Sequence, residues 1–165
     1  MRFALLAAFV MSAASVQAQG TSPPRFGGGF DVTMALLGQD LIPDGPSVGI
    51  RGRAALPLNR DVSVAGDLGV SAHLFEGASQ ARFVANPQAS VIVTLPGGGT
   101  ARYILAGFGG FVPFNEGAGG PTLHIGYGWA FPLNETSFFT EINPSLLIGS
   151  DKTDVVLAAR AGIIF

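Results

Sequence analysis

The stretch Val155-Val-Leu-Ala-Ala-Arg-Ala-Gly-Ile-Ile-Phe165 carries the clearest structural signal in this chain. Every second residue in it is apolar, from Val155 through Leu157 and Ile163 to the aromatic Phe165. Successive side chains of a β-strand point to opposite faces, so apolar residues at period two indicate a strand with one apolar face. The sequence therefore predicts a strand that continues to Phe165.

The first residues of the chain have a different character. Residues 1–18 begin with a basic side chain, continue as a short apolar core and end with Val16-Gln-Ala18. This combination is typical of a secretory signal peptide, so we expect cleavage after Ala18 and leave residues 1–18 out of the fold.

The composition excludes several classes of protein. The chain has 24 Gly, 13 Phe and only 12% charged residues, and its mean hydropathy is +0.44. No apolar run after the signal peptide approaches the ~20 residues that a membrane-spanning helix needs. High hydropathy without such a run predicts a barrel, in which only alternate residues face lipid. The chain has no Cys, which excludes a disulfide framework, and its net charge of −2 gives no sign of nucleic-acid binding.

Turn residues divide the rest of the chain into alternating segments. Gly, Pro, Asn, Asp and Ser gather between these segments, as expected for connections in a sheet. We expect eight strands, at about 28–37, 47–58, 62–75, 81–95, 101–114, 121–133, 137–148 and 155–165. The predicted fold is all-β: a closed, antiparallel, up-and-down, eight-stranded transmembrane β-barrel over 28–165, preceded by a short segment over 19–27.

The alternation assigns a face to each side chain. In the segment 62–75, Val64, Leu68 and Val70 share one face, whereas Asp67 and His73 share the other with small residues. A barrel in water would place the apolar face inside. Because the charged residues share the face of Gly, Ser and Ala, the pattern has the membrane sense, with polar residues inside and apolar residues outside.

The charges within the predicted strands form the most specific group of residues. We expect a lumen charge network of Asp31, Arg51, Arg53, Asp67, Arg82, Arg102, Glu141 and Arg160. Pairing the second and third strands around Arg60 places Arg53 opposite Asp67, and pairing the last two strands places Arg160 diagonal to Glu141. An eight-stranded barrel holds little beyond its own side chains, so the network predicts a plug. A selective pore or a proton path is the alternative.

Aromatic residues lie near the ends of the predicted strands. We expect an outward aromatic girdle of Phe30, Phe83, Tyr103, Phe111, Trp129, Phe131, Phe138 and Phe165. Such rings sit at the level of the lipid headgroups in membrane barrels. Phe108, Phe114 and Phe139 have the opposite parity, so we expect them to point into the lumen.

The two histidines offer little for catalysis or metal binding. His73 and His124 are both expected to face inward, and no further ligands at suitable spacing accompany them. Some outer-membrane barrels that deacylate lipid A carry a His-x-Ser arrangement, but His124-Ile-Gly126 lacks the Ser and Ser71-Ala-His73 has the reverse order. We expect no enzyme activity, no metal and no cofactor. A lipid-modifying barrel enzyme and a soluble exported ligand-binding barrel are the alternatives.

In its size, its alternation and its terminal Phe165, the chain resembles the small eight-stranded bacterial outer-membrane barrels of the OmpA-transmembrane-domain and OmpX class. This resemblance implies a location in the bacterial outer membrane and a role in envelope integrity or surface contact. It also implies that Ala161, Ile163 and Phe165 form the signal read by the barrel-assembly machinery, with periplasmic chaperones as earlier partners. Outer-membrane lipid and lipopolysaccharide are the expected lasting partners. We expect no periplasmic domain after Phe165.

The predicted outer connections are acidic. They carry Asp40, Asp44, Glu76, Glu116, Asp151 and Asp154, against Lys152 alone. We expect solvated loop tips that keep the protein soluble. Carboxylate oxygens are the ligands that divalent cations prefer, so the alternative is that such cations bridge this rim to lipopolysaccharide.

Overall fold

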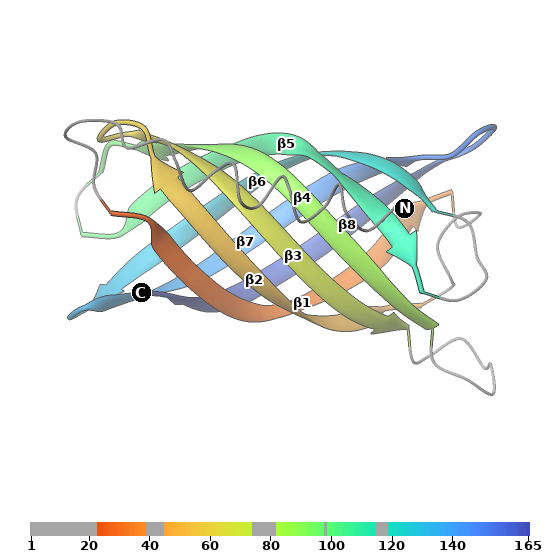
Figure 1. Cartoon of the computed structure of the whole chain (residues 1–165), viewed down its shortest axis with the longest axis horizontal. Helices are drawn as coiled ribbons and strands as arrows, with labels where there is room; N and C mark the ends of the chain where they lie inside the picture. The colour runs from red at the N-terminus through yellow and green to blue at the C-terminus, as the bar shows by residue number, and fades with distance from the viewer. Residues whose placement is uncertain (1–22, 39–44, 74–81, 98, 115–118) are drawn as a thin grey trace, which may run out of the picture.

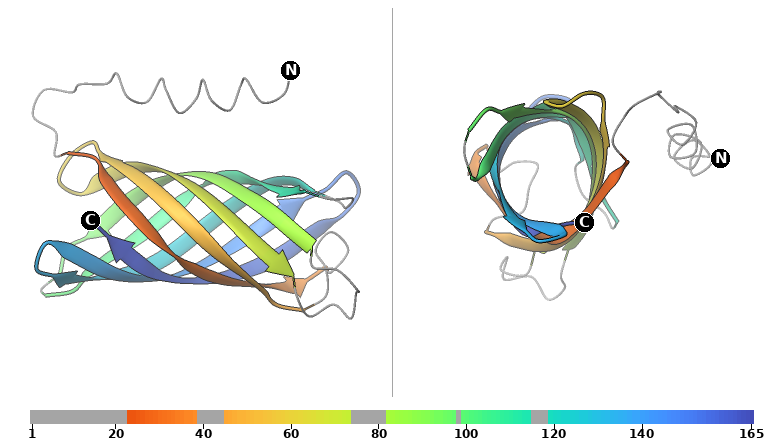
Figure 2. Two further views of the ribbon diagram at one scale, coloured as in Figure 1. Left: turned by 60° about the horizontal axis from the view of Figure 1, so that its bottom comes forward. Right: turned by 90° about the vertical axis from the view of Figure 1, so that its left-hand side faces the viewer.

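Eight antiparallel strands form a closed barrel in the computed structural model, which describes residues 23–38, 45–73, 82–97, 99–114 and 119–165 (Figure 1). The strands are β1 (Arg25–Leu37), β2 (Ser47–Pro57), β3 (Val62–His73), β4 (Arg82–Leu95), β5 (Ala101–Pro113), β6 (Gly120–Leu133), β7 (Thr136–Ile148) and β8 (Thr153–Ile164). Each strand pairs with its neighbours in the sequence, and β8 pairs with β1 (Figure 2). The eight-stranded, closed, up-and-down fold expected from the sequence is confirmed.

The predicted start of the barrel is wrong by three residues. β1 begins at Arg25, so residues 25–27, which we expected in the N-terminal segment 19–27, belong to the barrel. The amide of Phe165 donates to the carbonyl of Phe26 at 2.8 Å, and the amide of Phe26 donates to the carbonyl of Phe165 at 3.0 Å. The last strand therefore needs these residues of β1 as its partner, because an unpaired strand end would leave backbone groups unsatisfied. The predicted signal peptide lies outside the described residues.

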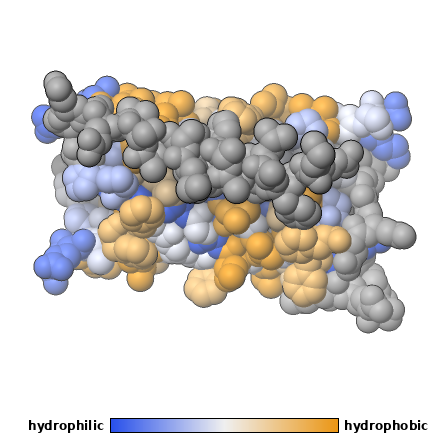
Figure 3. All heavy atoms as spheres, in the orientation of Figure 1, coloured by the Kyte–Doolittle hydropathy of each residue, from blue (hydrophilic) through white to orange (hydrophobic). Residues whose placement is uncertain are grey.

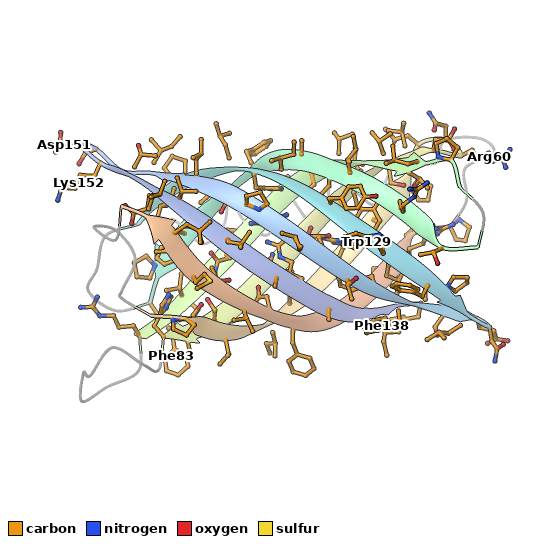
Figure 4. The ribbon with its side chains drawn as sticks, turned by 180° about the vertical axis from the view of Figure 1, so that it is seen from behind. Arg60, Phe83, Trp129, Phe138, Asp151 and Lys152 are labelled. Atoms are coloured by element: carbon orange, nitrogen blue, oxygen red, sulfur yellow. The ribbon has the colours of Figure 1, made fainter. Side chains whose placement is uncertain are left out.

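The barrel has two distinct ends. The turn at Arg60 lies at one end, and the turn with Asp151 and Lys152 lies at the other (Figure 4). We call the end with Arg60 the inner end, because Phe165 and the start of β1 also lie there (Figure 1). The opposite end is the outer end. Within the described part of the chain, no helix is long and apolar enough to cross a membrane.

On the face drawn in Figure 3, apolar side chains gather along the visible barrel wall, and hydrophilic ones lie at its two ends. Phe30, Ile50 and Ile125 are 72%, 62% and 60% exposed, whereas the charged Asp67 and Glu141 are 6% and 1% exposed. In water, a surface of this kind would expose far more contiguous apolar area than a monomer tolerates. Facing lipid, it is the expected surface of a membrane barrel. The predicted sense of the alternation is confirmed.

The predicted faces of β5 are wrong. Tyr103 and Phe111, expected in the outward girdle, are 6% and 7% exposed, and Phe108 and Phe114, expected in the lumen, are 63% and 60% exposed. Arg102, also expected in the lumen, is exposed on the outward face. It lies one residue from the end of its strand, where a long basic side chain reaches water from a lipid-facing position.

The outer rim also differs from the expectation. Asp154 is the second residue of β8 and is fully buried, so it does not belong to an outer connection. Asp151 and Lys152 are exposed in the 149–152 turn. Asp40, Asp44, Glu76 and Glu116 lie outside the described residues.

Candidate functional site

The candidate site is a cluster of charged and polar side chains inside the barrel. It consists of Asp31 on β1, Arg51 and Arg53 on β2, Asp67 on β3, Gln88 on β4, Tyr103 on β5, Glu141 and Asn143 on β7, and Arg160 on β8. We call this set the lumen cluster. Its three arginines balance its three carboxylates, so its formal charge is zero. All members are inward because they fall on alternate positions of their strands.

Glu141 is the centre of the lumen cluster. Its carboxylate accepts a bond from Arg53 Nη1 at 2.9 Å, one from Arg160 Nη1 at 2.7 Å and one from Tyr103 Oη at 3.1 Å. Asn143 Nδ2 donates a further bond at 3.3 Å. A buried carboxylate is tolerated only when its charge is paired and its lone pairs accept hydrogen bonds. Glu141 meets both conditions.

Arg53 joins Glu141 to a second carboxylate. Its Nε donates to Asp67 Oδ1 at 2.7 Å, and the two residues are directly opposite in the register of β2 and β3. Its guanidinium carbon also lies 5.6 Å from the ring centroid of Phe139. The planar fork of Arg can meet two acids and an aromatic face at once, which a lysine could not do.

A second set of bonds crosses the barrel through Gln88. The amide oxygen of Gln88 accepts from Arg51 Nη1 at 3.3 Å and from Arg160 Nη2 at 3.0 Å. Arg51 also contacts Asp31, with Nη2 3.1 Å from Oδ2. Because β4 and β8 lie opposite each other in the ring of eight strands, the bond between Gln88 and Arg160 spans the lumen.

Small residues make room for these side chains. A Cβ atom on Gly69 would lie 2.7 Å from Arg51 Nη2, and one on Gly128 would overlap the ring of Tyr103. The inward glycines of neighbouring strands therefore provide the space that the large polar side chains fill.

The structure brings together six of the eight residues that we expected in the network. It sets Glu141 directly opposite Arg160 rather than diagonal to it. Arg102 is on the outward face, and Arg82 is exposed at the outer end of β4, although Arg82 has inward parity. Gln88, Tyr103 and Asn143 were missed. Gln88 could have been predicted to face the lumen, because it alternates with the polar residues Asn86 and Ser90 along β4.

An apolar cluster fills the lumen near the outer end. It consists of Val84, Phe111, Leu147 and Val156, of which Leu147 is completely buried. The ring of His73 contacts Phe111 edge-on, with centroids 6.2 Å apart. The lumen thus contains an apolar layer in addition to the ion-paired lumen cluster.

The second histidine forms a pair with a serine. Ser90 Oγ lies 3.0 Å from His124 Nε2, and the two residues are 6% and 5% exposed. This pair could not be predicted from the sequence, because Ser90 and His124 belong to β4 and β6, which are not paired with each other but lie on either side of β5. The pair is buried on the lumen side of the barrel wall. A lipid substrate would lie on the outer side, so it cannot contact the pair.

The outward aromatic residues occupy both ends of the barrel. Phe83 lies towards the outer end, whereas Trp129 and Phe138 lie towards the inner end (Figure 4). Tyr127 and Trp129 pack edge to face with centroids 4.7 Å apart, and Phe131 and Phe138 pack at 6.2 Å.

Known structures resemble this barrel in fold. Neisserial surface protein A (NspA) matches with a TM-score of 0.69 and 13% identity over 88% of this chain and 98% of the other. The N-terminal β-barrel domain of Pseudomonas aeruginosa OprF matches with a TM-score of 0.55 and 16% identity over 88% and 99%. Ail, the attachment invasion locus protein of Yersinia pestis, matches with a TM-score of 0.56 and 16% identity over 86% and 97%.

No family model and no curated protein matches the sequence. The likeness to these solved structures is one of fold, and the apolar outer surface agrees with it. The chain therefore has the fold of an eight-stranded transmembrane barrel.

Proposed function

We propose that this protein is a closed structural barrel that supports the integrity of the outer membrane and does not conduct solutes. The observation that carries the proposal is the set of bonds across the lumen, from Arg53 on β2 to Glu141 on β7 and from Arg160 on β8 to Gln88 on β4. These strands are not neighbours, so the bonds occupy the space that a pore would need. An eight-stranded barrel has little volume left once such side chains fill it.

We propose no catalytic role. The pair that comes closest to a hydrolase site, Ser90 and His124, is buried on the lumen side of the barrel wall. A lipid-modifying enzyme needs its nucleophile within reach of a lipid, and an ester bond of a membrane lipid has no access to this pair. The proposal of a non-enzymatic role is supported by the fold shared with Neisserial surface protein A.

Surface contact is the second candidate role. Ail has been solved in complex with a heparin analogue, sucrose octasulfate, and it shares this fold. The outer connections of the present chain are short, with nine residues between β1 and β2 and four between β7 and β8. Short connections cannot build a large protruding platform, so the observations favour the structural role over a receptor-like one.

The expected partners follow from membrane insertion. Ile163 and Phe165 are 47% and 67% exposed, on the outward face of β8, and Ala161 shares their parity. We propose that this row is read by the barrel-assembly machinery after periplasmic chaperones deliver the chain, and that lipid and lipopolysaccharide surround the folded barrel.

A deletion strain tests the proposed role. Loss of a structural barrel weakens the membrane, so entry of a large hydrophobic dye should rise, and expression of the full-length parent should reverse the change. If the protein were a pore, its loss would instead lower the uptake of small hydrophilic solutes. A deletion that lowers solute uptake and leaves dye entry unchanged would overturn the structural role.

A further inference from the structure

Arg102 is the unexpected charge on the lipid-facing side of the barrel. It neighbours Tyr103, which is buried in the lumen, and Ile104, which is 42% exposed, so its own side chain lies on the outward face. Among the residues that the structure describes, none forms a hydrogen bond or an ion pair with the Arg102 side chain. A guanidinium carries five donors and a permanent charge, and on a lipid-facing surface near the strand end water and lipid headgroups can accept its hydrogen bonds.

The side chain of Arg102 reaches towards the rim of the inner end. A Cβ atom built on Gly97, in the connection between β4 and β5, would lie 3.2 Å from Arg102 Nη2. The guanidinium is therefore beside the turn that ends the membrane-spanning part of these strands, where lipid headgroups begin. At this level the groups available to a cation are the phosphates of the inner leaflet.

Trp129 is the neighbour of Arg102 on the same outward face. The two residues are directly opposite in the register of β5 and β6. Tyr127 holds the indole by an edge-to-face contact, with centroids 4.7 Å apart and the rings at 81°. Indole rings prefer the boundary between hydrocarbon and headgroup, so Trp129 and Arg102 are placed to meet the upper acyl chain and the phosphate of one lipid.

We propose that Arg102 and Trp129 form a binding site for one anionic phospholipid of the inner leaflet, with the phosphate on Arg102 and the upper acyl chain against Trp129. Arg102 binds the phosphate through the paired N–H donors of its guanidinium. Phosphatidylglycerol carries no cationic group, so the full negative charge of its phosphate is available to Arg102. In phosphatidylcholine, the choline cation partly cancels the charge of the phosphate. The inference rests on the membrane placement of the barrel and is independent of whether the lumen is closed.

The chain provides its own probe, because Trp129 is its only tryptophan. The folded full-length barrel is placed in vesicles that contain equal fractions of phosphatidylglycerol and phosphatidylcholine, and one lipid at a time carries bromine on its acyl chain. Bromine quenches tryptophan fluorescence on contact, so the quenching of Trp129 measures which lipid occupies the site. We expect about fivefold preference for phosphatidylglycerol, the effect of one basic residue at an anionic surface, and a smaller preference at high salt.

Two variants decide whether the preference belongs to this site. Arg102→Gln should abolish it, and Arg102→Lys should retain part of it, because the charge remains while the paired donors are lost. Arg60→Gln is the matched control, since Arg60 is exposed in a turn at the same end of the barrel. It should leave the preference unchanged. Equal quenching by both lipids in the parent would overturn the proposal, and so would a preference that persists in Arg102→Gln or disappears in Arg60→Gln. Different mobility of unboiled and boiled samples on a gel confirms that each variant is folded.

Discussion

Arg53 and Glu141 meet inside the barrel at 2.9 Å, although 88 residues separate them in the sequence. They belong to β2 and β7, between which β1 and β8 lie in the ring of strands. The contact is therefore possible only in a closed barrel, and it ties the first half of the chain to the second. It is the basis of the predictions below.

Replacement of Glu141 should be the most damaging single change in the lumen. Glu141→Ala leaves Arg53 and Arg160 buried without this carboxylate, and breaking a buried pair costs about 3–5 kcal/mol. We expect the free energy of unfolding, measured in lipid vesicles by urea titration, to fall by this amount. The matched control is Glu135→Ala, in the exposed turn between β6 and β7, which should change it by no more than ~0.5 kcal/mol. Equal effects of the two substitutions would contradict the central role of Glu141.

Arg53 and Asp67 should be energetically coupled. They are 2.7 Å apart, so Arg53→Gln and Asp67→Asn should together destabilise the barrel less than the sum of the single changes, by about 0.5–3 kcal/mol. A cycle of Asp67→Asn with Arg60→Gln, whose side chain is exposed at the inner end, should be additive. Additivity in both cycles would mean that Arg53 does not depend on Asp67.

The hydroxyl of Tyr103 should contribute to stability, although we first placed this residue in the lipid-facing girdle. Tyr103→Phe removes the bond to Glu141 and should cost about 1.5–3 kcal/mol, the range for hydrogen bonds to charged groups. Tyr127→Phe removes a hydroxyl from the outward face and should have little effect. If Tyr127→Phe costs as much as Tyr103→Phe, the inward placement of Tyr103 is wrong.

Two glycines test the close approach of β4 and β5. A Cβ atom on Gly107 would lie 2.8 Å from the Cα of Ser90 and would overlap the carbonyl of Ala89, whereas Gly66 has nothing within 4 Å of the same position. Backbone atoms cannot move aside as a flexible side chain can. Gly107→Ala should therefore lower the yield of folded barrel on refolding, measured by gel mobility. Gly66→Ala should fold as the parent does, and equal loss in both variants would contradict the assigned faces.

Alternation was enough to predict the fold, because each face of a barrel strand meets one kind of environment. β3 shows this: Leu68 is outward and Asp67 inward, as expected. The faces of β5 were predicted the wrong way round, because both faces carry bulky apolar residues. The one charged residue of the strand, Arg102, lies on the lipid-facing side. A charge near a strand end does not identify the lumen, since the side chain can reach water along the surface.

The partners within the lumen were harder to predict than the faces. The pairing of Arg53 with Asp67 was predictable, because it depends only on the register of two neighbouring strands and the turn between them. The bonds from Arg53 to Glu141 and from Arg160 to Gln88 depend on the diameter of the barrel and on the direction of long side chains across it. Neither quantity appears in a strand pattern, and the neutral Gln88 gives no charge signal.

Electrical recording in a planar lipid bilayer tests the closed lumen most directly. The folded parent, checked by its different gel mobility before and after boiling, is inserted from detergent and held at a transmembrane voltage in salt solution. We predict no steady ionic current above that of the bare bilayer for the parent, and brief openings for Glu141→Ala, in which the bond from Arg53 to Glu141 across the lumen is lost. A stable and reproducible conductance step in the parent would contradict the account.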